Sequence, residues 1–174
     1  AVFGGATVSW MNEETSEVGS VRLTPPEGIN PVAFIPDFEL RTAAARAALP
    51  ATVPHGDASF NVARGALLAA ILSGGAQASA GADLHALLME ATRDRLHQEQ
   101  RRAAMEPSLA LVDWLRGAGF AAVVSGAGPT VLSLEKVGAD IRRDAAGAGW
   151  RVVPLAVAAS GVQITRGSLA KVEF

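Results

Sequence analysis

The chain contains no cysteine and no tyrosine, and only 5% of its 174 residues are aromatic. Without cysteine it can form no disulfide, no thiolate zinc site and no cysteine nucleophile, so we expect a reducing, cytoplasmic location. The scarcity of aromatic side chains argues against a stacking platform for single-stranded nucleic acid. The formal net charge of −2 also argues against nucleic-acid binding, because proteins that bind nucleic acids usually carry a basic surface.

Long apolar runs are missing as well. The longest, residues 63–72, reaches about half the length of a membrane span and includes Arg64. The sequence therefore predicts no membrane association, and its first residues show no signal-peptide pattern. Apolar residues still make up 49% of the chain, which is enough for a domain with a buried core. The opening AVFGGATVSW starts in mid-pattern without methionine, so we expect a piece of a longer protein.

The most informative stretch is residues 121–134, AAVVSGAGPTVLSL. Two short apolar runs, which predict neighbouring buried strands, flank the break Ser-Gly-Ala-Gly-Pro-Thr. Gly126 and Gly128 allow positive φ and close approach of another group, and Pro129 ends the run of N–H donors. Such a turn can bind an anion through its backbone N–H groups, although a plain hairpin loop has the same composition.

Periodicity and turn residues predict the other elements. Strands are expected at residues 6–11, 18–23, 31–35, 121–124, 131–134, 151–157 and 162–166. Helices are expected to end at Gly5 and to span 43–49 (capped by Thr42), 54–72, 84–96 (capped by Asp83), 107–116 and 139–148. From residue 31 the order is βαββαβ with extra helices in the first crossover, an α+β, ferredoxin-like layout. The loop Pro25-Pro26-Glu27-Gly28 marks a boundary between residues 1–28 and 29–174.

A few polar residues in apolar surroundings are candidates for a binding site. Arg64 lies within the helical stretch FNVARGALLAAIL, and Asn61 lies one turn earlier on the same face. An arginine there either anchors a substrate, pairs with Asp57 or Glu90, or extends to solvent. The basic segment 93–102 is typical of a solvated helix end, but an arginine in it can also clamp a carboxylate or phosphate.

The sequence offers no metal site and no nucleophile. His55, His85 and His97 lack metal-ligand spacing with one another or with paired carboxylates. Ser125 has no adjacent base, and no two carboxylates are placed for general acid–base work.

Several segments, taken in order, resemble the homoserine kinases, a branch of the GHMP small-molecule kinases. They are the opening FGG, the stretch PVAFIPDFELRTAAARAALPATVPHGDASFNVARGALLAAIL, the stretch DRLHQEQRRAAMEP, and VVSGAGPTVLSL, which is similar to the third conserved motif of those kinases. The resemblance covers essentially the whole chain. It implies that residues 1–28 end an N-terminal α+β domain of the ribosomal S5 domain 2-like fold. Residues 29–174 would then be the GHMP kinase C-terminal domain.

The resemblance also implies an activity: ATP-dependent phosphorylation of the side-chain hydroxyl of L-homoserine to O-phospho-L-homoserine, in threonine biosynthesis, with Mg²⁺. Arg101 resembles the catalytic arginine that holds homoserine near the reacting phosphate. Arg64 resembles a second arginine, for the substrate carboxylate, and Asn61 joins this substrate-binding set. The family has a loop that lies beside the nucleotide phosphate loop and supports it. The residues that resemble this loop here are Ser125, Gly126, Ala127 and Gly128.

Two departures from the family pattern limit what the resemblance implies. Gln100 stands where an aromatic residue usually precedes the arginine, and Arg102 is adjacent, so Arg101 and Arg102 both fit that position. The glycine- and serine-rich phosphate loop and the His-Pro-Asp-Asn segment are absent. We therefore expect ATP and Mg²⁺ to bind mainly to a missing N-terminal half, and the chain alone to be inactive. A homodimer of the intact protein is left open.

Two other classes fit the same layout. A non-catalytic ferredoxin-like regulatory domain would use the glycine loop to hold an amino acid or anion without chemistry. An interaction domain would instead pair an exposed sheet edge with a partner.

Overall fold

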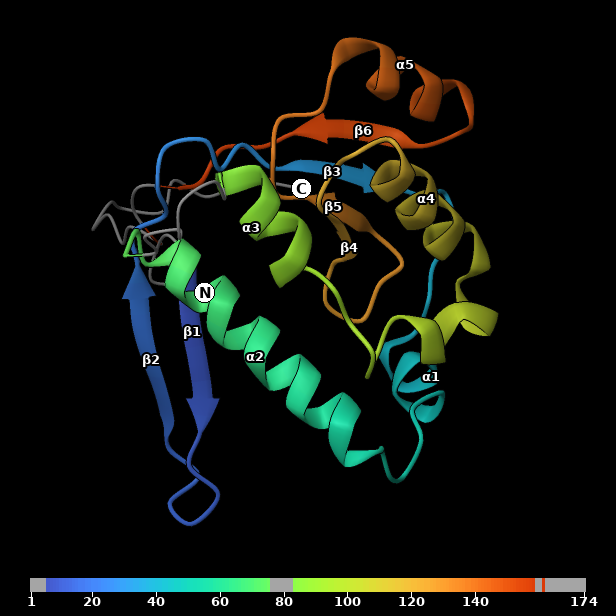
Figure 1. Cartoon of the computed structure of the whole chain (residues 1–174). Helices are drawn as coiled ribbons and strands as arrows, with labels where there is room; N and C mark the ends of the chain where they lie inside the picture. Colours follow the sequence, from blue (N-terminus) through green and yellow to red (C-terminus); the bar gives the residue numbers. More distant parts are fainter. Residues whose placement is uncertain (1–5, 76–82, 159–160, 162–174) are drawn as a thin grey trace, which may run out of the picture.

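A computed structural model describes residues 6–75, 83–158 and 161. The first described element is an antiparallel hairpin of β1 (Ala6–Met11) and β2 (Val18–Leu23). The side-chain oxygen of Asn12 accepts hydrogen bonds from the N–H groups of Glu14 and Thr15, which closes the turn. Both strands and the hairpin are as the sequence predicted. Figure 1 shows the hairpin standing apart from the main sheet.

The second sheet has four strands in the order β4-β5-β3-β6. They are β3 (Val32–Ile35), β4 (Ala122–Val124), β5 (Val131–Ser133) and β6 (Arg151–Pro154), and every neighbouring pair is antiparallel. This order is that of the predicted ferredoxin-like βαββαβ fold, because the two central strands are the first and third in sequence. The fold class is therefore confirmed.

Six helical segments connect these strands. They are α1 (Thr42–Ala47), α2 (His55–Leu72), α3 (Leu84–Ala91), the 3₁₀ helix η1 (Glu99–Ala104), α4 (Glu106–Gly117) and α5 (Ala139–Gly147). Asp83 caps α3 as predicted, since its Oδ1 accepts from the N–H of Ala86 at 2.8 Å. The helix end at Gly5 and the strand at 162–166 lie outside the described residues.

Several boundary predictions are wrong, among them that of the last described strand, which ends at Pro154 rather than at residue 157. Thr42 is the first residue of α1 rather than its cap, and Arg41, in extended conformation, occupies the cap position without a side-chain bond. Helix α3 ends at Ala91, five residues before the expected end, because the chain turns away at Thr92 to meet α2. These errors shift boundaries but leave the order of elements unchanged.

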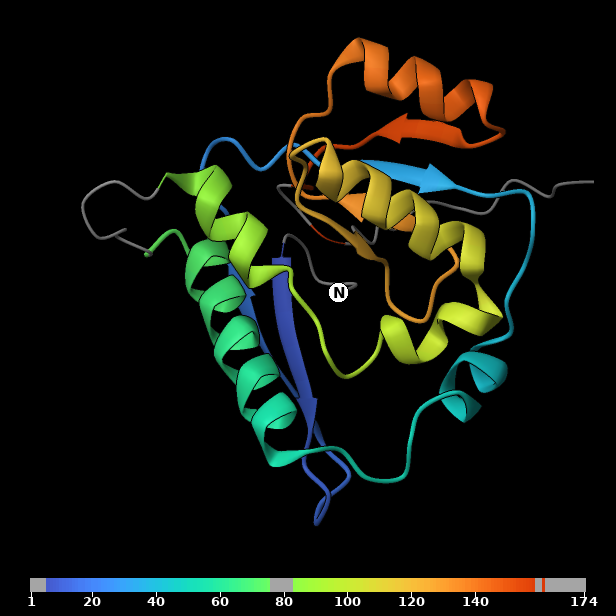
Figure 2. The same ribbon diagram turned by 45° about the vertical axis from the view of Figure 1, so that its right-hand side comes forward.

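The core of the sheet lies beneath α4 and α5. Phe34 and Leu115 are fully buried there, and Ile141 and Ala145 of α5 pack on the same cluster. Both regular crossover helices therefore cover one face, as expected from right-handed connections; Figure 2 shows α4 lying across the strands.

Helices α2 and α3 form a separate cluster at the β4 side of the sheet. Ile71 and Leu88 are buried between them and pack near Ala121 and Leu134, which flank β4 and β5. Figure 1 shows α3 beside the four-stranded sheet and α2 running alongside the hairpin. Within the described part of the chain, no helix has the length and apolar character needed to cross a membrane.

Candidate functional site

A cavity of about 550 Å³ lies where α2, the end of α3 and η1 meet β4 and β5. Its lining comprises Asn61, Arg64, Gly65, Leu68, Ala91, Thr92, Arg93, Asp94, His97, Gln98, Arg101, Val123, Val124, Ser125, Gly126, Leu132 and Leu134. Three of these lining residues are arginines, Arg64, Arg93 and Arg101, whereas Asp94 is the one carboxylate among them. The cavity therefore favours an anionic ligand.

The floor of the cavity is the sheet face opposite α4. Val123 and Leu132 are direct partners in the β4–β5 register and line the cavity, whereas their neighbours Ala122 and Val131 point into the core. This alternation follows from the two-residue period of a strand. The two short strands thus carry the core on one face and the site on the other.

The glycine loop between β4 and β5 is held from both sides. The N–H of Ser125 donates to Thr130 O at 2.8 Å, and Ser108 Oγ donates to Pro129 O at 2.6 Å. Gly128 has φ +87°, and a Cβ there would lie 2.7 Å from Sδ of the buried Met105. Glycine is required at this position because both the conformation and the space exclude a side chain.

Arg101 joins this loop to α1. Its Nε donates to Ala45 O at 3.1 Å and its Nη1 donates to Gly126 O at 3.1 Å. The residue is only 9% exposed, and among the described residues no carboxylate lies within ion-pair distance of it. A buried guanidinium bound only to neutral carbonyls has no counter-charge beside it, so its remaining N–H groups favour an anion in the cavity.

The neighbouring Arg102 does not line the cavity and contacts other residues. It forms ion pairs with Glu99 at 2.8 Å and with Asp113 at 3.0 Å, and it is not a lining residue of the cavity. These carboxylates raise the pKa of the Arg102 guanidinium above its usual range. Of the two adjacent arginines, Arg101 therefore faces the cavity.

A second network fixes the segment between α3 and η1. Asp94 Oδ2 accepts from the N–H groups of His97 at 2.7 Å and Gln98 at 2.6 Å, and Asp94 Oδ1 accepts from Asn61 Nδ2 at 2.5 Å. Burial opposes ionisation of Asp94, but these hydrogen bonds outweigh it and lower the pKa of the carboxyl. Gln98 in turn accepts from the N–H of Val124 at 2.7 Å through its Oε1. The network therefore ties α2 to the end of β4.

Arg64 lies at the cavity wall beside an aromatic ring. Its guanidinium carbon lies 3.6 Å from the centroid of Phe60, and its Nη2 donates to Glu90 Oε1. Arg93 also pairs with Glu90, at 3.2 Å, whereas Arg95 pairs with Asp57 at 3.4 Å and stacks on the same ring at 3.9 Å. Of the partners that the sequence left open for Arg64, the structure selects Glu90.

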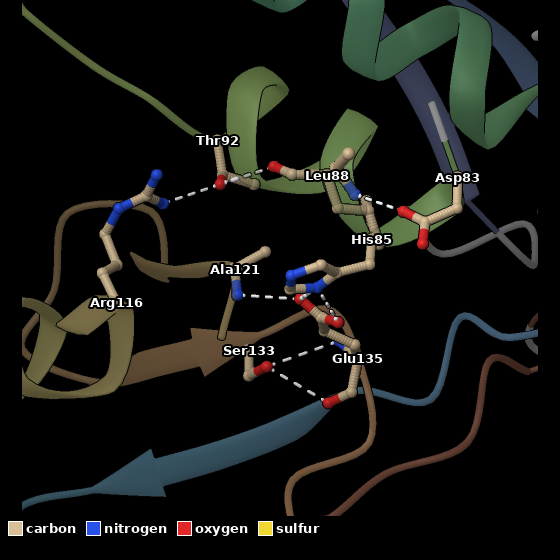
Figure 3. Close-up of polar contacts among 9 residues, drawn as sticks. Asp83, His85, Leu88, Thr92, Arg116, Ala121, Ser133 and Glu135 are labelled. Atoms are coloured by element: carbon tan, nitrogen blue, oxygen red, sulfur yellow. Dashed lines mark hydrogen bonds and ion pairs between the residues drawn. The ribbon is translucent and has the colours of Figure 1, made fainter. Parts of the chain in front are cut away.

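A buried polar network supports the site from behind (Figure 3). Arg116 Nη2 donates to Met89 O at 2.7 Å, and its Nη1 donates to Thr92 Oγ1 at 2.8 Å and to Ala122 O at 3.3 Å. Glu135 accepts from the N–H of Ala121 at 2.8 Å. These contacts connect the end of α3 with both strands of the cavity floor.

The same carboxylate of Glu135 lies 2.8 Å from His85 Nδ1, on the first turn of α3 (Figure 3). Ser133, on β5, bonds the backbone of Glu135 at 3.1 Å. The position of α3 over the sheet is therefore set at both ends of the helix.

The structure brings together most of the residues that the sequence selected. Asn61, Arg64, Arg101, Ser125 and Gly126 line one cavity. Ala127 and Gly128 do not; they face Met105 and the cluster under α1. Asn61 already bonds Asp94 and, through Oδ1, the N–H of Arg95 at 2.9 Å. Its contact with a substrate stays a prediction.

The sequence analysis missed the roles of Asp94 and Gln98, and it named Glu90 only as one of two possible partners of Arg64. The helix prediction through residue 96 concealed Asp94, although an aspartate followed by a turn is a capping signal. Gln98 and Glu90 contact residues 26 positions away in each case, so no local pattern could have shown the role of Gln98 or decided between Glu90 and Asp57.

The cavity does not fit a magnesium ion. Both oxygens of Asp94 are occupied by N–H donors, and among the described residues no group of three His, Asp or Glu side chains could hold a metal. No helix N-terminus with a glycine- and serine-rich turn lines it either. This cavity therefore fits an anionic small molecule better than a metal ion.

Comparison with known proteins was made for the whole chain. Residues 67–148 match the family model "GHMP kinases C terminal". Homoserine kinase from Streptomyces avermitilis is 43% identical over 164 residues, which are 94% of this chain and 50% of that protein. The crystal structure of homoserine kinase from Cytophaga hutchinsonii has a TM-score of 0.68 at 19% identity, over 83% of this chain and 46% of that one.

A putative homoserine kinase structure from Listeria monocytogenes has a TM-score of 0.58 at 26% identity, over 96% of this chain and 54% of that one. The chain thus spans about half the length of the curated relatives it matches.

Proposed function

Because this chain carries a GHMP kinase C-terminal domain and is a homologue of homoserine kinases, we propose that it is the C-terminal half of such a kinase. The reaction transfers the γ-phosphate of ATP to the side-chain hydroxyl of L-homoserine and yields O-phospho-L-homoserine, in threonine biosynthesis. The similarity to homoserine kinases at 42–43% identity supports the substrate, and the charge of the cavity supports the same assignment.

The observation that carries this proposal is the position of Arg101. Its buried charge has no carboxylate partner in the described part of the chain, and it contacts the glycine loop directly. The substrates carry a carboxylate and phosphates, and guanidinium groups bind both through paired hydrogen bonds. Arg101 would thus hold an anionic group of the substrates against the loop.

The chemistry requires little covalent participation from the protein. The homoserine oxygen attacks the γ-phosphorus, the bond to the bridging oxygen breaks, ADP leaves, and the hydroxyl proton passes to phosphate or solvent. Catalysis then depends on alignment of the two substrates and on stabilisation of the negative charge around the phosphorus. Arg101 would supply a positive charge that stabilises this negative charge. Arg64 would anchor the amino acid, and residues 125–128 would support the phosphate-binding turn.

The same proposal covers the rest of the molecule. Residues 1–28 would be the last part of the first kinase domain, and residues 29–174 the second domain. The phosphate loop and the Mg²⁺ ligands would lie in the other half, the intact enzyme would work in the cytoplasm, and a homodimer is one option for its assembly.

A coupled assay tests the proposal. ADP release is measured with L-homoserine and ATP, first with this chain alone and then with the N-terminal half of a close homologue added. We expect turnover only from the combination. Turnover by the chain alone would overturn its assignment as a half, and none from either would contradict the kinase. A thermal-shift comparison adds a control: stabilisation by threonine but not homoserine would favour a regulatory domain.

A further inference from the structure

Glu90 lies behind the cavity wall and pairs with two arginines that form it. Its Oε1 accepts from Arg64 Nη2, and its Oε2 accepts from Arg93 Nη1 at 3.2 Å. Arg64 and Arg93 are lining residues, whereas Glu90 is not. One carboxylate therefore serves two guanidinium groups, and this part of the site keeps one net positive charge.

Arg64 is not fully satisfied by this arrangement. Its Nε is buried and has no hydrogen-bond partner in the part of the chain that the structure describes. A buried donor without an acceptor is unfavourable, so the N–H can be completed by an oxygen of a ligand in the cavity. The stacking of the guanidinium on Phe60 at 3.6 Å holds Arg64 in place independently of Glu90.

We propose that Glu90 is a resident counter-ion that competes with the ligand for Arg64. An incoming carboxylate or phosphate exchanges for the Glu90 carboxylate on the guanidinium, and Glu90 moves to solvent. The residue thereby lowers the affinity of the site for every oxyanion and sets a threshold for binding. The inference rests on the proposed function only for the identity of the ligand, which would be homoserine or a nucleotide phosphate.

The geometry makes this exchange easy. The Glu90 side chain is 41% exposed, so its carboxylate regains water when it leaves Arg64. Exposed ion pairs contribute little net free energy, because the charges are well solvated when apart. The hydrogen bonds from Arg64 and Arg93 lower the pKa of Glu90, so the competitor is ionised at neutral pH.

The test uses the 174-residue chain and its Glu90→Gln variant, which keeps the size of the side chain but removes the charge. Isothermal titration calorimetry measures binding of inorganic phosphate, of L-homoserine, and of 3-aminopropan-1-ol, which lacks the carboxylate. We expect Glu90→Gln to bind phosphate and homoserine about two- to fivefold more tightly, the range that an exposed ion pair allows. Binding of the amino alcohol should not change.

Matched variants identify the cause. Glu99→Gln removes a carboxylate from the Arg102 pair outside the cavity, and should leave all affinities unchanged. In an Arg64→Ala background, Glu90→Gln should give no gain. A gain that persists without Arg64, or equal or weaker phosphate binding by Glu90→Gln, overturns the proposal, and circular dichroism confirms that each variant is folded.

The outcomes separate this inference from the kinase assignment. Tighter phosphate binding by Glu90→Gln, with no homoserine binding by either protein, supports the counter-ion; the two-half assay then decides the kinase assignment, because part of the homoserine site is expected in the N-terminal half. Homoserine binding that Glu90→Gln does not strengthen contradicts the counter-ion and leaves the kinase standing. Absence of phosphate binding by both proteins overturns the inference, since the site then holds no oxyanion.

Discussion

The Nη1 atom of Arg101 lies 3.1 Å from the carbonyl oxygen of Gly126, 25 positions later in the chain. This contact joins the 3₁₀ helix η1 to the glycine loop and places a buried positive charge in the lining of the cavity. The loop and the basic segment thus act as one structural unit, and each prediction below tests a part of it.

Replacement of Arg101 by lysine should abolish most of the proposed activity. Lysine keeps the charge but cannot reach Ala45 O, Gly126 O and a ligand together, so the fork geometry is lost. We expect kcat/KM of the two-half enzyme to fall by about a hundredfold or more. The matched Arg102→Lys change should cost less than about threefold, since Arg102 faces Glu99 and Asp113. Equal losses would refute the assignment of Arg101.

Gly128→Ala should destabilise the domain. The new Cβ would lie 2.7 Å from Met105 Sδ, and φ of +87° strains any side chain. We expect the free energy of unfolding to fall by about 2–4 kcal/mol, measured by urea denaturation. Gly126→Ala is the control, because it has φ +60° but nothing within 4 Å, and should cost only about 1 kcal/mol. The same loss for both would show that packing on Met105 is unimportant.

Asp94 should stabilise the protein in a pH-dependent way. Hydrogen bonds lower its pKa in the folded state despite burial, so its contribution is full above the unfolded pKa, about 3.9. It is lost as the pH falls through the lower folded pKa. We expect Asp94→Asn to cost about 1–2 kcal/mol of unfolding free energy at pH 7, and the difference from wild type to shrink below about pH 4.

The control for this pH dependence is Asp140→Asn, at an 85% exposed side chain that pairs only with Arg143. Its stability curve should follow that of the wild type across the range. A constant penalty for Asp94→Asn down to pH 2 would contradict the ionised role of the carboxyl.

Arg116→Met should loosen the wall between α3 and the sheet. The change leaves Met89 O, Thr92 Oγ1 and Ala122 O without their donor, in a half-buried setting. We expect a loss of about 2–3 kcal/mol in unfolding free energy. Hydrogen exchange should also show faster opening of residues 84–91 than of α4. Arg143→Met, at an exposed position, serves as the control and should be neutral.

The sequence was a good guide to elements because their signals are local. Asp83 precedes α3 as a capping side chain, as the pattern predicted, and α2 ends at the predicted residue 72, with Gly74 just beyond it at positive φ. The end of α3 was wrong because a tertiary contact decided it: Asn61 binds Asp94 and the N–H of Arg95, which pulls the chain out of the helix. Helical periodicity carries no information about such a contact.

The site was predictable only where a motif carried it. The glycine loop stood out in the sequence, and the resemblance to homoserine kinases pointed to Arg101 or Arg102; in the structure Arg101 contacts the loop. The choice between Asp57 and Glu90 as the partner of Arg64 could not be predicted, because the sequence does not show which of the two carboxylates lies closer to Arg64 in space. The structure gives Asp57 to Arg95 and Glu90 to Arg64.

The two acceptors that hold Arg101 are peptide oxygens, of Ala45 and Gly126. No substitution can delete a peptide oxygen, so a saturation mutagenesis screen would not reveal these partners through a loss of polarity. It would reveal position 45 only as a size limit, since Ala45 is fully buried, and position 126 only through its backbone angle. Side-chain substitutions therefore cannot test the hydrogen bonds that hold the Arg101 guanidinium. Backbone substitutions can, for example the replacement of an amide by an ester.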